Sequence, residues 1–512
     1  MRFITRALPI FGLLMMFSLT GISQHANGTC GTNDLHPLTV ERYQENIDVL
    51  RSGAVLPRTG AITYVPIKYI LGARSNGTGR VEETALLDMH CKLNQMYADQ
   101  DVQFYIKDGT YSYINNDQFY NEHKRTEAIA MAANADPNAV NVFIPKDANN
   151  DGNTVGVTLG YYTPSRDWLV VRIDQINSQS QTLPHELGHF LSLAHPHVGW
   201  ECEPFGSDVQ GWPKAPTLSP CPPSRPSEYA DGSNCKVAGD LLCDTPADYN
   251  GLRVNGCVYN LGAQDPTGEL IDPNEKLIMA YFSDNCVSEF SEEQKAMVQI
   301  DLASTRRAKL KLGTWSPPAT SVGTNFWINS PTSPVPFSDG KVTLDWADVT
   351  GATHYIVELA TNRFFSGSEF FSTKGSSIEL ENISAGQKYS YRIKPYNLAV
   401  TCTSFSSTFS FQAAGTSVSS ADDISFVRSF SVFPNPAKRD GQVFVSVVSD
   451  ESFEGDVKVL DLTGKIVYDG TRQFKTGDNE FPIEPNTEMS GVYILYVKTN
   501  AGVLKQKFVV SE

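Results

Sequence analysis

The stretch HELGHFLSLAH, residues 185–195, contains three histidines and one glutamate at the spacing of a metal site. His185 and His189 are four residues apart, so on a helix they lie on one face and both imidazoles can reach one metal ion. Glu186 can reach a water molecule on that metal, and His195 supplies a third nitrogen. Three neutral imidazoles suit zinc with one open position, so the spacing predicts a hydrolytic zinc site.

Three features of this stretch leave alternatives open. The histidines would be solvated if the helix lay on the surface, although histidine is scarce, with nine in 512 residues. His197 is a rival third ligand, but the spacing favours His195. Ser192 stands three residues after His189, where a sharp turn favours glycine, so we expect a looser or reshaped turn.

Length and charge limit the class of protein. A chain of 512 residues is too long for one hydrophobic core and predicts about two to four domains. Apolar residues make up 41% of the chain, which favours globular domains over disorder. The net charge of −16 argues against a nucleic-acid-binding protein.

The N-terminus has the order of a secretory signal peptide. Arg2 and Arg6 precede an apolar run over residues 7–19, and small residues follow at Gly21 and Ser23. We therefore expect residues 1–23 to be removed on export. A membrane anchor is the alternative, but the run is shorter than a span requires, and no other stretch predicts a membrane span.

The nine cysteines fit an oxidising compartment. Cys30, Cys91 and Cys402 are isolated in the sequence, and because the total is odd at least one thiol has no disulfide partner within the chain. The other six can form three disulfides, whose connectivity the spacing leaves open: Cys202, Cys221, Cys235, Cys243, Cys257 and Cys286.

The first part of the mature chain divides into a pro-segment and an α/β domain. Residues 24–58 are polar, partly helical and end near Arg51 and Arg58, which predicts a short pro-segment. Residues 59–313 alternate strands and helices, which predicts an α/β architecture. The expected strands are 62–71, 102–106, 140–145, 155–162 and 168–174. The expected helices are 40–50, 86–96, the helix of His185 with Thr182 as N-cap, and a helix from Ser291 to about Lys311 with a capping box.

An all-β unit is expected next, over residues 325–414. Short alternating strands are separated there by turn residues at the spacing of a sandwich. Trp346, Leu380 and Tyr389 fall at core positions. The segment resembles a fibronectin type III module, for which a spacer role is favoured over a binding role.

A second all-β unit, residues 427–512, ends the chain. It carries FPNP at 433–436, LDLTGK at 460–465 and GVYIL at 491–495. In this order they resemble the C-terminal sorting domain of proteins exported by the type IX secretion system; the alternative is an ordinary small β-sandwich. The resemblance implies the type IX export machinery as a partner and a secreted, extracellular or outer-surface location.

Four further segments, taken with the histidine stretch, resemble the pappalysin (cytophagalysin) family of metzincin zinc peptidases. LIMAY at 277–281 resembles the Met-turn, and DNC at 284–286 follows it as in that family. Gly239-Asp240 with DTP at 244–246 resembles a family segment, and CGT at 30–32 resembles its pro-segment motif. Together these segments cover about residues 30–312.

The resemblance implies roles for several residues. Glu186 would take a proton from the metal-activated water and pass it to the leaving amine. Tyr281 would donate a hydrogen bond to the tetrahedral oxyanion, and Met279 would form a hydrophobic floor under the histidines. Ala280 departs from the family, in which this position is often acidic.

Two further ligand assignments are less direct. Cys30, as a thiolate on the zinc, would keep a zymogen inactive; the alternative is a disulfide with Cys91 or another cysteine. By resemblance, Asp240 and Thr245 occupy positions that bind calcium in some family members.

The sequence thus predicts a secreted zinc endopeptidase zymogen that cleaves extracellular proteins. Its fold would be a metzincin-like α/β (α+β) zinc peptidase domain followed by two all-β sandwich domains. By resemblance, an extended protein or peptide substrate would pair with the edge strand near residues 155–161. The rival from another class is an inactive surface adhesin on a peptidase fold, against which the intact set of metal and catalytic residues argues.

Overall fold

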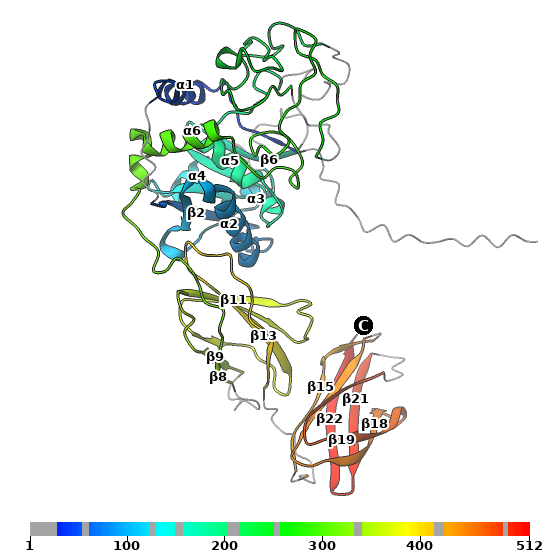
Figure 1. Cartoon of the computed structure of the whole chain (residues 1–512). Helices are drawn as coiled ribbons and strands as arrows, with labels where there is room; N and C mark the ends of the chain where they lie inside the picture. The colour runs from blue at the N-terminus through cyan, green and yellow to red at the C-terminus, as the bar shows by residue number, and fades with distance from the viewer. Residues whose placement is uncertain are drawn as a thin grey trace, which may run out of the picture.

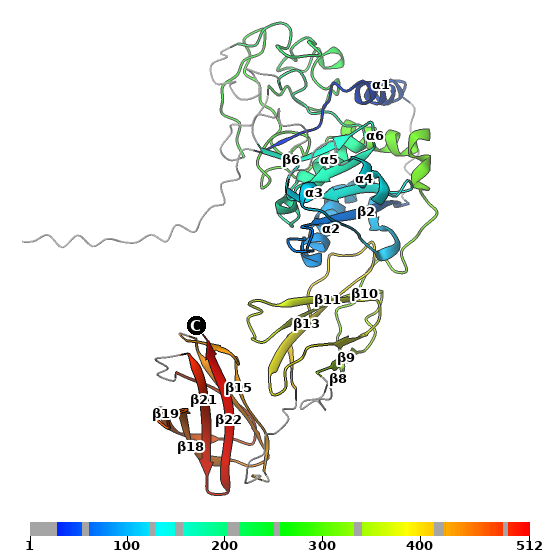
Figure 2. The ribbon, with the colours of Figure 1, turned by 180° about the vertical axis from the view of Figure 1, so that it is seen from behind.

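A computed structural model shows three units in a row: an N-terminal α/β unit, a middle β unit and a C-terminal β unit (Figures 1 and 2). The expected signal peptide, residues 1–23, lies outside the described residues. Within the described ranges no helix is both long and apolar enough to cross a bilayer. The structure describes residues 28–53, 61–121, 128–148, 157–201, 214–249, 257–331, 340–413, 424, 426–439, 441–484 and 490–511.

The N-terminal unit is built on a seven-stranded sheet. Its strand order is β1-β6-β7-β5-β2-β3, and β4 also pairs with β2. All pairs are parallel except β6 with β7. The strands are β1 (Gly28–Cys30), β2 (Thr63–Ala73), β3 (Val102–Ile106), β4 (Ser112–Asn115), β5 (Val140–Ile144), β6 (Val157–Thr163) and β7 (Trp168–Val171).

Helices pack against this sheet and fix the histidine stretch beside it. Parallel strands covered on both faces are continuous apolar runs, and all five residues of β5 are buried. Helix α5 contacts β6 and β7, α2 contacts β3, and α1 contacts α6. The helices are α1 (Pro37–Arg51), α2 (Glu83–Tyr97), α3 (Asp117–Asn121), α4 (Ala128–Asn134), α5 (Thr182–Phe190) and α6 (Glu292–Ala303).

Two predicted elements are too long. Strand β7 ends at Val171 rather than at Asp174, because a 3₁₀ turn follows it. Ser291 opens α6 with the expected capping box, but α6 ends at Ala303 rather than near Lys311, because the next residue is extended. The start of the predicted strand 155–162 lies outside the described residues.

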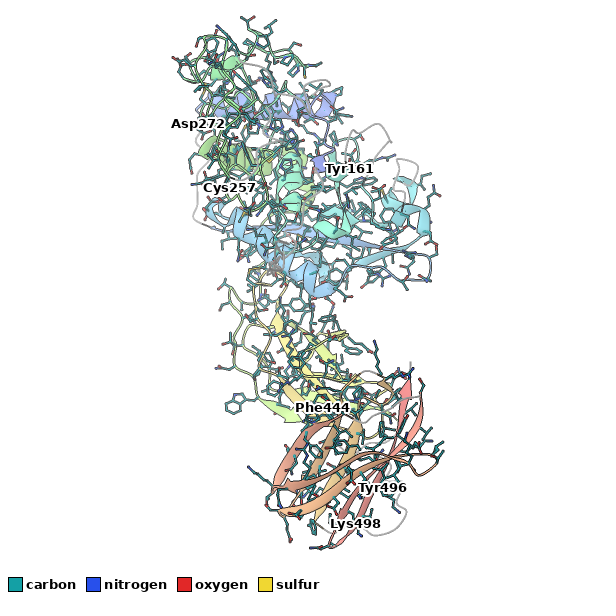
Figure 3. All side chains as sticks on the ribbon, turned by 90° about the vertical axis from the view of Figure 1, so that its right-hand side faces the viewer. Tyr161, Cys257, Asp272, Phe444, Tyr496 and Lys498 are labelled. Carbon is teal, nitrogen blue, oxygen red and sulfur yellow. A yellow bond between two sulfur atoms is a disulfide. The ribbon has the colours of Figure 1, made fainter. Side chains whose placement is uncertain are left out.

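The segments 214–249 and 257–276 have little regular structure, as expected from their Pro, Gly, Asp and Cys content. Disulfides Cys235–Cys243 and Cys257–Cys286 hold this region together, and Figure 3 marks Cys257. Cys221 is also disulfide-bonded. The structure therefore supplies pairings that the spacing leaves open.

The middle unit consists of a three-stranded and a four-stranded sheet. Trp346, Leu380 and Tyr389 are buried in its core, as predicted. The first sheet contains β8 (Ile328–Ser330), β9 (Val342–Trp346) and β12 (Ser377–Leu380). The second contains β10 (His354–Ala360), β11 (Glu369–Thr373), β13 (Lys388–Tyr396) and β14 (Phe409–Gln412).

A disulfide joins the middle unit to the N-terminal unit. It links Cys91 of α2 to Cys402, 311 residues further along the chain. Both cysteines are isolated in the sequence, and docking of the two units brings them together. Asn94 Nδ2 and Gln103 Nε2 also donate hydrogen bonds to the carbonyl of Ala399. The middle unit is therefore attached at a second point besides the chain itself.

The C-terminal unit has sheets of three and five strands; Figure 3 marks Tyr496 and Lys498 on it. Gln412 Nε2 of the middle unit donates to Ser431 Oγ at 2.5 Å. The smaller sheet contains β15 (Val427–Phe433), β17 (Val443–Ser449) and β20 (Gly477–Ile483). The larger contains β16 (Ala437–Lys438), β18 (Phe453–Asp461), β19 (Ile466–Phe474), β21 (Gly491–Thr499) and β22 (Gly502–Ser511).

Candidate metal centre

Helix α5 is buried along its whole length. The prediction of Thr182 as N-cap is wrong, because the cap residue is Gln181, whose side chain makes no capping hydrogen bond. The Thr182 hydroxyl instead donates to Oε1 of Gln175 at 3.0 Å. His185 and His189 are only 7% and 1% exposed, which contradicts the alternative of a solvated surface helix.

The Nε2 atoms of three histidines converge on one point. Nε2 of His195 lies 3.1 Å from Nε2 of His185 and 3.0 Å from Nε2 of His189. Nitrogen ligands of one tetrahedral zinc would be about 3.3 Å apart, so the spacing fits a single ion. Three lone pairs that face one another in a buried space repel unless a cation lies between them.

Backbone carbonyls hold the two helix histidines in the tautomer that a metal ligand requires. Nδ1 of His185 lies 2.7 Å from the carbonyl oxygen of Ile278, and Nδ1 of His189 lies 2.9 Å from that of Leu193. A carbonyl only accepts, so each Nδ1 carries the proton and each Nε2 keeps its lone pair.

Two carboxylates flank the His195 imidazole instead. Its Nδ1 lies 2.9 Å from Oδ2 of Asp34 and 2.6 Å from Oε1 of Glu201. His197, the rival ligand, stacks on His195 with ring centroids 4.8 Å apart, and its Nε2 lies 3.2 Å from Glu201. The structure therefore brings His195, and not His197, to the other two ligand nitrogens.

Cys30 lies at the fourth corner of this group. Its Sγ is 3.4 Å from Nε2 of His189, and the four ligand atoms all lie within 4.8 Å of one another. Sulfur and nitrogen ligands of one tetrahedral zinc would be about 3.6 Å apart. In the described part of the chain Cys30 is free and Cys91 pairs with Cys402, which contradicts the alternative Cys30–Cys91 disulfide.

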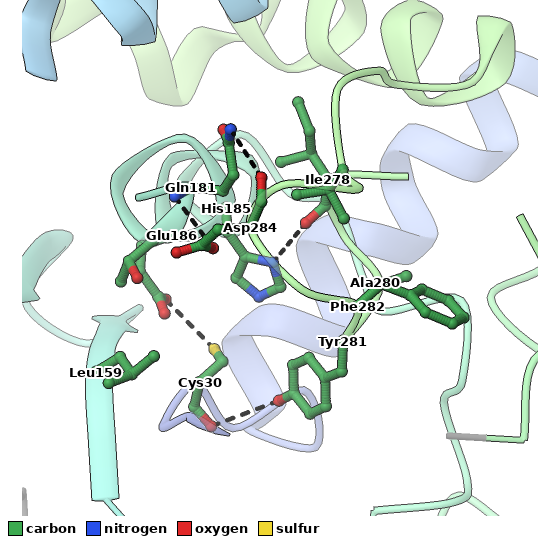
Figure 4. A pocket seen from close by; sticks show the side chains of 12 residues that line it. Cys30, Leu159, Gln181, His185, Glu186, Ile278, Ala280, Tyr281, Phe282 and Asp284 are labelled. Atoms are coloured by element: carbon green, nitrogen blue, oxygen red, sulfur yellow. Dashed lines mark hydrogen bonds between the residues drawn. The ribbon is translucent and has the colours of Figure 1, made fainter. Parts of the chain in front are cut away.

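Each residue of the CGT segment has a contact that explains it. Cys30 Sγ lies 3.4 Å from Oε2 of Glu186 (Figure 4). A Cβ on Gly31 would collide with a side chain of β6, so glycine lets the segment approach that strand. The Thr32 hydroxyl donates to Oε2 of Glu186 at 2.8 Å and accepts from the backbone N–H of Tyr162 at 2.8 Å.

The segment 277–281 lies under and beside the histidines. Sδ of Met279 sits so close to Gly188 that a Cβ at that position would collide with it, and Met279 is fully buried. The Tyr281 hydroxyl donates to the carbonyl of Cys30 at 3.5 Å (Figure 4). The Tyr281 and His195 ring centroids are 4.7 Å apart. Both residues that resemblance assigns to this segment therefore lie at the metal centre.

Burial controls the protonation of these groups. It lowers the pKa of His185 to about 3 and that of His189 well below its usual range, which keeps both imidazoles neutral. Burial raises the pKa of Glu186 to about 7. Burial and the Glu186 charge raise the pKa of the Cys30 thiol to about 12. A bound cation would favour the charged forms of this carboxyl and this thiol.

Ser192 forms a sharp turn after α5. Its φ of +63° is in the left-handed region that glycine usually occupies. The turn is tight, since the N–H of Leu193 donates to the carbonyl of Gly188 at 2.9 Å. Ser192 Oγ donates to Oδ1 of the buried Asp301 at 2.7 Å. The expectation of a looser turn is wrong, because this hydrogen bond offsets the strain of a serine there.

The two predicted calcium residues lie in direct contact. Thr245 Oγ1 donates to Oδ1 of Asp240 at 2.9 Å. Within the described residues, Oδ2 of Asp240 and Oε1 of Glu228 are buried without a hydrogen-bond partner. Burial raises the pKa of Asp240 to about 8, and burial with nearby acidic charges raises that of Glu228 to about 9. Unpartnered carboxylate oxygens of this kind fit a cation site.

Sequence reasoning gave Thr32 of the CGT segment no role and missed Asp34, Glu201 and Glu228 near these two centres. Asp34 lies four positions after Cys30, and this proximity was its one available signal. Glu201 reaches His195 only through the turns of residues 195–200. No sequence pattern around Glu228 marks it as a candidate ligand.

Comparison with known proteins identifies the C-terminal unit. The family described as the secretion system C-terminal sorting domain matches residues 431–511. This sorting domain marks proteins of the type IX secretion system, so the chain is exported, and such proteins are secreted and often attached to the outer cell surface. No curated protein matches the chain.

Two solved structures that this chain resembles are distant from it. A promirolysin mutant of Tannerella forsythia is 13% identical with a TM-score of 0.32, covering 55% of this chain and 96% of that one. The fn3 domain of the human collagen alpha-1(XX) chain is 18% identical with a TM-score of 0.15, covering 21% of this chain and 98% of that one. Scores this low support no conclusion about family or activity.

Replacing Ser192 tests the turn. Ser192→Ala keeps the left-handed conformation and loses the hydrogen bond to Asp301, so we expect the free energy of unfolding to fall by about 1.5 kcal/mol. Ser192→Gly loses the same bond but relieves strain of roughly 1 kcal/mol, so its loss should be smaller. Urea denaturation followed by tryptophan fluorescence measures both. An alanine variant more stable than the glycine variant would contradict this account.

Proposed function

We propose that the chain is a secreted zinc endopeptidase of the pappalysin type, made as a zymogen. One observation carries the proposal: three imidazole Nε2 atoms and the Sγ of Cys30 surround one buried point, with the carboxylate of Glu186 beside it. His185, His189 and His195 would hold the zinc. Zinc bound there would polarise a scissile carbonyl and lower the pKa of a water molecule.

The side chains around this point have distinct tasks. The Glu186 carboxylate is positioned to hold the proton of the attacking water and to deliver it to the leaving amine. The Tyr281 hydroxyl, which donates to a carbonyl oxygen in the zymogen, would donate to the oxyanion of the substrate in the same way. Met279 and Gly188 keep the helix in place below the ligands.

The edge of β6 is the proposed substrate-binding strand. The pro-segment strand β1 occupies it, pairing in parallel from Gly28 with Val157 to Cys30 with Gly160. When β1 leaves, the same backbone groups become available to an extended peptide. A pocket lined by Leu159, Ile278 and Phe282 lies next to Glu186 and would take a substrate side chain (Figure 4).

Latency follows from the same contacts. Cys30 would take the ligand position that a water needs, and Thr32 binds the carboxylate that would act as base. The pro-segment also binds the rest of the unit away from the metal centre. Arg42 Nη1 donates a hydrogen bond to Tyr162 Oη, and Asn46 Nδ2 donates one to Asp301 Oδ1.

An inactive adhesin on the same fold is the alternative function. An inactive adhesin would not require the Cys30 thiol at the metal group or the Thr32 hydroxyl on Glu186. The pairing of an intact site with a segment that blocks it favours an enzyme whose activity must be delayed until export.

A glutamate variant tests the catalytic role. Glu186→Ala should reduce cleavage of a denatured protein by at least about 100-fold, because the proton acceptor is lost, while one zinc per chain remains. Glu292→Ala, an exposed change on α6, is the control and should cleave as wild type does. Zinc content and cleavage are measured on the same activated samples. Unchanged cleavage by the Glu186 variant would contradict the role of Glu186 as the proton acceptor.

A cysteine variant tests latency. Cys30→Ala should let the precursor activate faster than wild type, because the thiol no longer fills the fourth ligand position. Leu35→Ala alters an exposed side chain of the same segment and should not change the activation rate. The time course of precursor processing and of cleavage is the measurement. Equal rates for the Cys30 variant and wild type would reject the thiol as the inhibitory ligand.

The calcium site can be tested through its pH dependence. Without calcium, Asp240 and Glu228 stay protonated in the folded chain up to a pKa of about 8 and about 9, against roughly 4 when unfolded. Their stabilisation is therefore complete below the unfolded pKa and is lost as the pH rises toward the folded values. Bound calcium would keep both carboxylates ionised in the folded state, which removes this loss.

The measurement is the melting temperature with calcium and with a calcium chelator. We expect the difference between the two to grow from about pH 5 to about pH 8. Asp240→Asn should remove most of that growth, because the site loses one of its two carboxylates and binds calcium more weakly. A wild-type difference that stays at zero throughout would exclude calcium at this site.

A further inference from the structure

Two carboxylates approach Nδ1 of His195 to 2.9 Å or less, whereas the carboxylate beside Nδ1 of His189 lies 3.6 Å away. The Nδ1 atoms of His185 and His189 are held by backbone carbonyls, which no side-chain substitution removes. Nδ1 of His195 instead faces Oδ2 of Asp34 at 2.9 Å and Oε1 of Glu201 at 2.6 Å. A histidine that binds metal through Nε2 must carry its proton on Nδ1, so a carboxylate there fixes the tautomer and raises the basicity of the ligand.

The two carboxylates come from opposite sides of the expected cleavage point. Asp34 belongs to the pro-segment, and its side chain is 5% exposed. Glu201 belongs to the part that stays after activation, and its side chain is 31% exposed. Removal of the pro-segment would therefore leave His195 with one of its two partners.

The chain around Glu201 is built to hold this side chain under the histidine. The N–H of Val198 donates to the carbonyl of His195 at 3.3 Å, and the N–H of Trp200 donates to that of His197 at 3.1 Å. The Trp200 ring stacks on Tyr249 with centroids 4.3 Å apart. These turns bring residue 201 back to a ligand six positions earlier.

A second metal ion is a poor explanation for these contacts. His195, His197 and Glu201 do lie close enough to surround an ion. However, a neutral imidazole has one lone pair, and that of His195 already points from Nε2 to the group with His185 and His189. The proton on Nδ1 is therefore what the carboxylates face.

We propose that Glu201 is the positioning residue for His195, and that Asp34 of the pro-segment shares this task until activation. This inference rests on the proposed zinc site, and it states which carboxylate orients His195 before and after activation. In the zymogen each carboxylate can substitute for the other. In the activated chain Glu201 alone keeps His195 in its ligand tautomer.

Zinc affinity of the full chain, measured by competition with a chelating dye, tests the sharing. Asp34→Ala and Glu201→Ala should each weaken binding by no more than about threefold, because one carboxylate remains. The double variant should weaken it by about 10- to 100-fold. Glu201→Gln in the Asp34→Ala background should recover part of the loss, since its amide oxygen still accepts a hydrogen bond.

Further readouts separate positioning from folding. The visible absorption bands of the cobalt-substituted chain should change in the double variant and not in Glu269→Ala, an exposed control. The melting temperature of the metal-free chain should stay the same in all variants. After removal of the pro-segment, Glu201→Ala alone should show the 10- to 100-fold loss, and excess zinc should restore its cleavage rate.

Three results would overturn the inference. One is a double variant that binds zinc as wild type does, and another is a loss no larger than the product of the two single losses. The third is a lower metal-free melting temperature in Glu201→Ala with unchanged zinc affinity, which would assign Glu201 to folding of the loop. A wild-type chain that takes up no zinc contradicts the proposed function as well, so the two failures are distinguishable.

Discussion

The Nε2 atoms of His185, His189 and His195 meet in a buried space, where their lone pairs repel one another unless a cation lies between them. The elements around His185, His189 and His195 hold their Nε2 atoms about 3 Å apart against this repulsion. The buried helix, the carbonyl of Ile278 and the left-handed turn at Ser192 each fix one part of this geometry. A cation converts the repulsion into attraction.

The pro-segment acts on this centre as an internal ligand. Cys30 places its sulfur at the metal group, and Gly31 lets the segment pack closely against β6. Thr32 donates a hydrogen bond to the Glu186 carboxylate. Further along, the Tyr43 hydroxyl donates to the backbone carbonyl of Asp240, at the candidate calcium site. One short segment thus contacts both candidate ion sites, so its removal would change the surroundings of each site.

The residues of the metal centre could be predicted because helical spacing is a local property. Four positions along a helix suffice to place His185 beside His189, and the CGT and LIMAY segments could be read from resemblance. The Cys91–Cys402 pair could not be predicted, because it depends on how two units dock across 311 residues. Glu201 was missed for a related reason: the tight turns that return it to His195 have no periodic pattern. The end of β7 was misjudged because a 3₁₀ turn follows it, and the end of α6 was misjudged because the next residue, Ser304, is extended.

Zinc X-ray absorption on the full-length chain and on its Cys30→Ala variant tests whether three histidines and the pro-segment thiol bind one zinc ion. We expect one zinc per chain with three nitrogen neighbours at about 2.0–2.1 Å and one sulfur neighbour at about 2.3 Å in wild type. In the variant the sulfur contribution should disappear while the three nitrogens remain. A chain without zinc, or a wild-type spectrum with no sulfur neighbour, would contradict the account.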